Sequence, residues 1–175
     1  MKKTYIIVID GQNGAGKTTT ARLLHQRMPF TALINWNAIR KCISDFRPTK
    51  KYHDLATKIT LSMTQIYLDN GVNVIYEAYF GHRRFIYEIA KTVRGYKKTK
   101  MCVYQIEAPY HIRVQRAKER WLRGEKDHFL TKVHIQKNDD FYKKNKFQSA
   151  RIIFDSSQLT AKQIVNRILK DLRHA

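Results

Sequence analysis

Short apolar runs alternate along this chain with segments whose apolar residues recur every three to four positions. The runs are residues 5–9, 31–36, 72–76, 101–106 and 150–154. Continuous runs of this length, bounded by turn residues, are typical of buried parallel strands. Because helical patterns separate the runs, the chain predicts an α/β fold in which helices cover both faces of a five-stranded parallel sheet.

The helical patterns occupy residues 17–27, 52–70, 83–94 and 111–122, a short segment after residue 36, and a last segment after a capping box. Thr160 and Gln163 form that box. In the longest helix, the spacing predicts a buried stripe of Leu55, Ile59, Met63, Ile66 and Tyr67, with Gly71 as the C-terminal cap. Residues 126–146 are basic, with aromatic patches and no clean period.

Charge is the unusual feature of the composition. The 175 residues, which suit one domain, include 34 Lys and Arg against 14 Asp and Glu, for a net charge of +20. Such a field favours polyanionic partners such as nucleic acid or nucleotides. A compositional bias of the source genome explains the charge as well, so both interpretations stay open.

Cysteine usage and hydropathy bear on the compartment. Cys42 and Cys102 suggest neither a disulfide framework nor a metal pair. The first apolar run meets Asp10 too soon for a signal peptide, and no segment is long enough to span a membrane. The sequence therefore predicts a cytoplasmic protein.

The strongest chemical signal is GQNGAGKT at residues 11–18, which matches the Walker A pattern G-x-x-x-x-G-K-[ST]. The segment follows a predicted strand and opens a predicted helix. In that context, glycines let backbone N–H groups surround phosphate oxygens at the positive end of the helix. We expect Lys17 to reach the β- and γ-phosphates of a nucleotide and Thr18 to ligate Mg²⁺.

This P-loop predicts ATP as the cofactor, with GTP as the alternative, together with Mg²⁺. The residues expected to bind the nucleotide are Gly11, Asn13, Gly14, Ala15, Gly16, Lys17, Thr18 and Thr19.

With this motif, the chain resembles the small P-loop kinases, a group that includes nucleoside monophosphate, gluconate, shikimate, zeta-toxin-like and polynucleotide kinases. The resemblance covers nearly the full length. It implies one kinase domain over residues 1–175, built as a three-layer α/β/α sandwich with strand order 2-3-1-4-5. It also implies a small helical lid over approximately residues 116–146.

The segment after the second strand is similar to one in which polynucleotide and zeta-type kinases carry an Asp followed, three residues on, by an Arg. The resemblance gives that Asp the role of base toward the acceptor hydroxyl. Arg40 fits the pattern, but Asn37 stands at the Asp position, and an amide takes no proton at neutral pH. Asn37 is expected to hydrogen-bond the acceptor or, alternatively, only to cap the next helix.

Glu77 ends the third strand and resembles the Walker B carboxylate of the family. Because strand ends converge on the P-loop, Glu77 is expected to bind Mg²⁺, contact the acceptor or act as the base. Asp10 is the rival for the base. Each is alternatively a structural acid that balances a neighbouring cation.

Arginines recur after the fourth strand, in a segment that resembles the helix leading into the kinase lid. Arg116 and Arg120 are four residues apart and share one helix face, close to Arg113 and Arg123. We expect Arg116 and Arg120 to grip the triphosphate and neutralise transition-state charge. The alternative is a solvated basic face. Residues 155–157 resemble, more weakly, the loop along the adenine.

These features predict an ATP-dependent phosphotransferase whose acceptor, held near Asn37, Arg40 and Glu77, is a nucleoside, a nucleotide or a nucleic-acid end. Two alternatives remain: a nucleic-acid-binding P-loop NTPase or switch, and a kinase of a non-nucleotide small molecule. Aromatic residues interleave with lysines over residues 141–147. They are either a stacking surface for single-stranded nucleic acid or one face of a half-buried helix.

Overall fold

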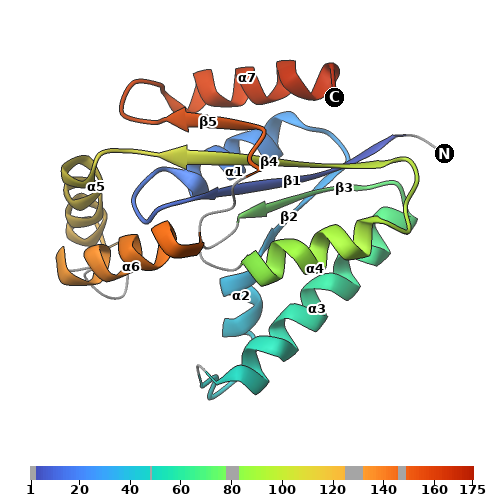
Figure 1. The fold of residues 1–175 in the computed structure, drawn as a ribbon, viewed down its shortest axis with the longest axis horizontal. Coiled ribbons are helices and arrows are strands. Elements are labelled where there is room, and N and C mark those ends of the chain that lie inside the picture. The colour runs from blue at the N-terminus through green and yellow to red at the C-terminus, as the bar shows by residue number, and fades with distance from the viewer. Residues whose placement is uncertain (1–2, 48, 78–82, 125–131, 146–148) are drawn as a thin grey trace.

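A five-stranded parallel sheet forms the middle layer of the molecule (Figure 1). The computed structural model describes residues 3–47, 49–77, 83–124, 132–145 and 149–175. The strands are β1 (Thr4–Gly11), β2 (Thr31–Asn35), β3 (Asn73–Glu77), β4 (Thr99–Glu107) and β5 (Ile152–Asp155). Their order is β2-β3-β1-β4-β5, which confirms the predicted topology.

Helices cover both faces of this sheet. The elements α1 (Lys17–Arg27) and α7 (Ala161–Arg173) lie on one face, and α3 (Lys50–Asp69) and α4 (Arg83–Val93) lie on the other (Figure 1). Successive residues of β1 serve the two faces: Ile6 and Val8 pack toward α3 and α4, and Ile7 and Ile9 toward α1 and α7. The three-layer α/β/α sandwich is therefore confirmed, as is the capping box of α7.

Three further helices lie near the carboxyl ends of the strands (Figure 1). They are α2 (Trp36–Lys41), α5 (Tyr110–Leu122) and α6 (Lys132–Asn145) (Figure 1). In parallel sheets this edge is where ligands bind. None of the described helices combines the length and the apolarity needed to cross a membrane.

The buried face predicted for α3 is confirmed only in part: Met63 and Tyr67 are partly buried against the core, but Leu55, Ile59 and Ile66 are exposed. Leu55 and Ile66 are 44% and 61% exposed, whereas the helix buries Ala56, Thr60, Thr64 and Leu68. The threonines satisfy their hydroxyls internally, because Thr60 Oγ1 donates to the Ala56 carbonyl at 2.7 Å and Thr64 Oγ1 to the Thr60 carbonyl at 2.8 Å. Threonine therefore belongs to the core stripe here.

Helix α6 has a buried stripe that its hydropathy hides. Ile135, Asp139 and Tyr142 are spaced as one helix face, and all three are at most 5% exposed. An acid in the middle of this stripe breaks the apolar period. The buried Tyr142 favours the half-buried helix over the stacking surface, although Phe147 lies outside the described residues. Residues 125–131 and 146 of the predicted lid also lie outside them.

Candidate functional site

The Walker A segment forms a tight loop between β1 and α1. Gly11 has a φ of 142°, and a Cβ atom there would overlap the carbonyl oxygen of Ile106 in β4. Gly16 caps α1 in the left-handed conformation, with a φ of 97°. The Thr20 N–H donates to the Gly16 carbonyl at 3.0 Å, so the amides just before Thr20 are those that a helix N-terminus offers to an anion.

Lys17 stands at the start of α1 with a nearly buried side chain. Its Nζ donates to the Gln12 carbonyl at 3.0 Å, so the side chain folds back over the loop that it belongs to. Burial lowers the pKa of Lys17 to about 8, although the carboxylates of Asp10 and Glu77 oppose the shift. A bound triphosphate would restore the favourable environment that this ammonium lacks.

Thr18 and Glu77 meet between α1 and the end of β3. The Thr18 hydroxyl donates to Glu77 Oε1, and Asn35 Nδ2 donates to Glu77 Oε2 at 3.1 Å. Asn35 and Glu77 are paired residues of β2 and β3, so the sheet register brings them together. A hydroxyl and a carboxylate beside a phosphate loop are a donor set that fits Mg²⁺. Among the described residues, no group of three or more His, Cys, Asp or Glu forms a separate metal site.

Asp10 lies beneath the loop and is 2% exposed. Burial raises the pKa of its carboxyl, and the Gly11 N–H and the Lys17 ammonium oppose the shift. Its register neighbour on β4 is the buried Gln105. Burial raises the pKa of the Tyr142 phenol on α6, and the negative charge of Asp10 raises it further. The Asp10 carboxylate therefore balances part of the charge of Lys17.

Arg116 connects α5 to the loop after β5. Its Nη1 donates to Ser156 Oγ at 2.9 Å, and its Nη2 donates to the Ser156 carbonyl at 2.8 Å. The Ser156 hydroxyl donates in turn to the Ala15 carbonyl at 2.7 Å. Arg116 Nη1 also lies 3.4 Å from the Gly14 carbonyl oxygen. The structure therefore places Arg116 and residue 156 against the P-loop.

A pocket of about 480 Å³ opens beside this contact. Its walls come from the P-loop and α1 (Gly16, Thr19), from α5 and its C-terminal cap (Arg116, Arg120, Arg123) and from the β5–α7 connection with the start of α7 (Ser157 to Ala161). The volume lies within the usual range for small-ligand sites. Arginines line one wall, and the amides and hydroxyls of the connection line another.

In the segment after β2, the alternative that Asn37 caps the next helix is wrong. Asn35, not Asn37, caps α2, because its Oδ1 accepts the Ala38 N–H at 3.1 Å. Asn37 is half-buried in the first turn of α2. The Arg40 guanidinium makes cation–π contacts with two aromatic rings, 5.0 Å from the centre of the Trp36 ring and 5.1 Å from that of Phe46.

A second cavity, of about 540 Å³, lies between α2, α3 and α4. Trp36, His53 and Phe85 give it aromatic walls. Its charged lining residues are Lys50, Asp54, Lys58 and Glu88, two of each sign. Trp36 directly follows Asn35, the partner of Glu77, so this cavity adjoins the carboxyl ends of β2 and β3.

Arg113 belongs to the arginine run of the sequence, but the pattern assigns it no role of its own. It is 2% exposed and pairs with Asp139 of α6. A signal existed, because Arg113 is four residues before the buried Ala117 and therefore lies on the inner face of α5. The predicted pair Arg116 and Arg120 instead lines the pocket.

The Walker A loop follows a strand of the middle-layer parallel sheet, Thr18 contacts Glu77, and α5 carries arginines toward the loop. These features define a P-loop protein with a kinase-like fold. The sequence profile of the AAA domain family matches residues 6–144, and the chain belongs to that family. No curated protein sequence matches the chain.

Solved structures share the fold at low identity. A sugar kinase from Janibacter sp. HTCC2649 is 16% identical, with a TM-score of 0.70 over 97% of this chain and 95% of that one. A gluconokinase from Sinorhizobium meliloti 1021 is 12% identical, with a TM-score of 0.66 over 99% and 98%. A chain of the Pnkp1/Rnl/Hen1 RNA repair complex is 21% identical, with a TM-score of 0.66 over 83% of this chain and 46% of that one.

Proposed function

We propose that this protein is a kinase that transfers the γ-phosphoryl group of ATP to a hydroxyl of a small acceptor. The observation that carries the proposal is the pair of cavities. One adjoins Gly16 and Arg116, and the other adjoins the strand ends near Glu77. An NTPase or switch needs only the first cavity, whereas a transferase needs a second site for the acceptor.

The first cavity suits the donor nucleotide. The base would lie in the pocket that Arg116 and the β5–α7 connection line, and the phosphates would follow the loop toward Lys17. Thr18 and Glu77 are the residues that would hold Mg²⁺, which neutralises charge on phosphate oxygens. Arg120, which also lines this pocket, adds positive charge where the leaving ADP develops negative charge.

The transfer forms a bond from the acceptor oxygen to the γ-phosphorus and breaks the bond from that phosphorus to the β,γ-bridging oxygen. ADP leaves with the electron pair of the broken bond. We assign Asn37 and Arg40 to holding the acceptor, and we propose that the hydroxyl proton passes to solvent or to the transferred group. A loose transition state places little demand on a dedicated base.

The second cavity supports a nucleoside or nucleotide as the acceptor. Aromatic walls from Trp36 and Phe85 suit a flat ring, and the polar groups of Asp54 and Glu88 suit its ring substituents. The balanced charge of the lining differs from the excess on the molecule as a whole, and a groove for a polyanion would be basic. A nucleic-acid end and a non-nucleotide small molecule are the competing acceptors.

We further propose that residues 1–175 act as one domain in which residues 116–146 serve as the lid. We also propose a cytoplasmic location, because the cytoplasm supplies ATP and keeps thiols such as those of Cys42 and Cys102 reduced.

The test is the fate of the γ-phosphoryl group. Purified protein is incubated with Mg²⁺, γ-labelled ATP and one candidate acceptor at a time. The candidates are nucleosides, nucleotides, 5′-hydroxyl oligonucleotides and sugars. We expect label on a nucleoside or nucleotide and none with Lys17→Ala, which controls for contaminating kinases. Label on an oligonucleotide or a sugar would refute the acceptor class, and label only in free phosphate would establish the NTPase instead.

A further inference from the structure

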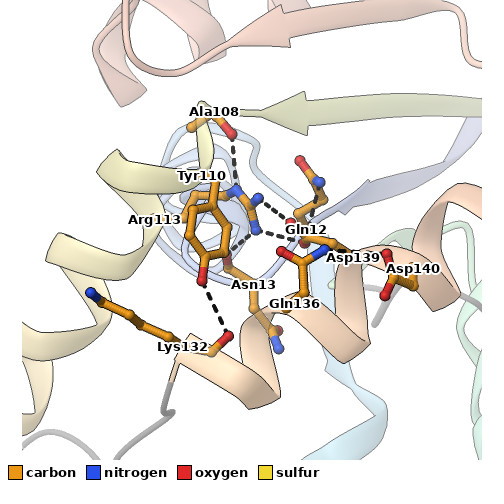
Figure 2. A network of polar contacts seen from close by, with 9 residues as sticks. All are labelled: Gln12, Asn13, Ala108, Tyr110, Arg113, Lys132, Gln136, Asp139 and Asp140. Atoms are coloured by element: carbon orange, nitrogen blue, oxygen red, sulfur yellow. Dashed lines mark hydrogen bonds and ion pairs between the residues drawn. The ribbon is translucent and has the colours of Figure 1, made fainter.

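Arg113 and Asp139 form a buried ion pair between α5 and α6 (Figure 2). Their side chains are 2% and 7% exposed. Arg113 Nη1 donates to Asp139 Oδ1 at 2.8 Å, and Nη2 donates to Oδ2, so the pair is bidentate. Arg113 Nε donates to the Ala108 carbonyl at 2.9 Å, which fixes the plane of the guanidinium.

Both members of the pair also contact the P-loop. Arg113 Nη1 lies 3.4 Å from the Asn13 carbonyl oxygen, and Gln12 Nε2 donates to Asp139 Oδ1 at 3.3 Å (Figure 2). The backbone of α5 approaches the same loop, since a Cβ on Gly14 would come within 2.8 Å of the Arg113 carbonyl oxygen. Two consecutive loop residues are thus held from outside the loop.

These contacts continue to the lysine of the Walker A motif. The Gln12 carbonyl accepts from Lys17 Nζ, and the Gln12 side chain donates to Asp139. A carboxylate on α6 is therefore joined to the phosphate-binding lysine through a single residue. The positive charge of Arg113 also acts on Lys17 and helps to lower its pKa.

A buried ion pair is an expensive way to attach a helix, because both charges lose their hydration. Helix α6 has other attachments, such as Ile135 in the core and the Tyr110 hydroxyl, which donates to the Lys132 carbonyl at 3.2 Å. If α6 left its place, the Arg113 guanidinium would lose its carboxylate partner and keep only the backbone carbonyls of Ala108 and Asn13. The docked position of α6 and the shape of the loop are therefore energetically linked.

We propose that Arg113 and Asp139 are positioning residues that couple the docking of α6 to the nucleotide-binding shape of the P-loop. The inference rests on the proposed function only in requiring that the loop binds a nucleotide. Coupling is reciprocal, so bound nucleotide stabilises docked α6, and a broken pair weakens nucleotide binding.

The test begins with affinity for Mg·ADP, measured by calorimetry on variants shown to be folded by circular dichroism. Asp139→Asn is expected to weaken binding roughly tenfold, within the range usual for coupled sites. Asp140→Asn, an exposed neighbour on the same helix, is the control and should bind as the parent does. Arg113→Gln added to Asp139→Asn should cost less than it costs alone, because the partner is already gone.

Hydrogen exchange separates coupling from a merely structural role. In the parent protein, Mg·ADP should slow amide exchange in residues 132–145, and Asp139→Asn should abolish this protection. If Asp139→Asn does not fold, Gln12→Ala decides, since it removes the hydrogen bond from the loop to Asp139 and leaves the ion pair intact. We expect weaker binding and lost protection in that variant as well.

Parental affinity together with parental protection in the folded Asp139→Asn variant, or in Gln12→Ala if Asp139→Asn does not fold, would overturn the proposal. A parent protein that binds no nucleotide would instead refute the proposed function.

Discussion

Lys17 carries its ammonium group on a nearly buried side chain, and this burial makes nucleotide binding depend on pH. In the free protein, burial lowers the pKa of its ammonium to about 8. Below that pH the ammonium is present and attracts the triphosphate; above it, the amine must take up a proton on binding. We expect the Kd for Mg·ATP to rise about tenfold between pH 7 and pH 9, as measured by calorimetry.

The control for this pH dependence is Lys17→Arg, because a guanidinium stays charged throughout the range. Its Kd is expected to change little between the two pH values, whatever its absolute affinity. An equally steep rise in Lys17→Arg would mean that another group titrates.

Glu77 contacts Thr18 and Asn35, so its removal should act on the metal more than on the nucleotide. Glu77→Gln keeps the size of the side chain and removes its charge. We expect the apparent affinity for Mg²⁺ to fall about 10- to 100-fold in a titration of activity against Mg²⁺. Nucleotide binding without Mg²⁺ should stay close to the parental value, and a loss there would contradict the assignment.

At the scale of residues, the sequence predicted candidate site residues only where a local pattern was strong. The contiguous motif over residues 11–18 singled out Lys17 and Thr18 as candidates, and the end of a strand singled out Glu77. No local pattern predicted the burial of Asp139, because its partner Arg113 lies on another helix and an acidic residue is normally assigned to the solvent-exposed face. Such pairs form only when the fold brings distant segments together.

At the scale of elements, the buried face of α3 depends on threonine hydroxyls. Thr64 is fully buried, and its Oγ1 is in contact with the hydroxyl of Tyr76 on β3. Thr64→Val keeps the shape but leaves a buried phenol without this partner. We expect it to lower the free energy of unfolding by about 1–3 kcal/mol in denaturant titrations.

Removing both hydroxyls tests the physical reason for that loss. Thr64→Val combined with Tyr76→Phe leaves no orphaned polar group, so much of the stability should return. Additive losses in the double variant would mean that the contact is not the cause.

The α3 face also shows why elements were easier to predict than their orientation. The strands and most helices followed from runs and periods, but a hydropathy stripe counted Thr60 and Thr64 as polar and chose Leu55 and Ile66 instead. Internal hydrogen bonds to carbonyls four residues back made the threonines suitable for the core. The strand order came from the family resemblance, since periodicity alone does not order parallel strands.

At the scale of the whole molecule, the net charge of +20 predicts salt-sensitive binding of polyanions. Binding of a single-stranded oligonucleotide should weaken with salt, with a log–log slope of roughly −0.7 per phosphate contacted. The KM of a nucleoside acceptor should change little, because it enters the charge-balanced cavity beside Trp36. Equal salt slopes for the two would favour a nucleic-acid acceptor.

Calorimetric titration of Mg·ATP tests most directly whether the loop from Gly11 to Thr18 holds a nucleoside triphosphate. The parent protein is predicted to bind, and Lys17→Ala is predicted to bind at least about tenfold more weakly, since a charge-assisted contact to phosphate is lost. Lys162→Ala, an exposed lysine on α7, is the control and should bind as the parent does. A parent that does not bind, or equal affinity in Lys17→Ala, would contradict the account.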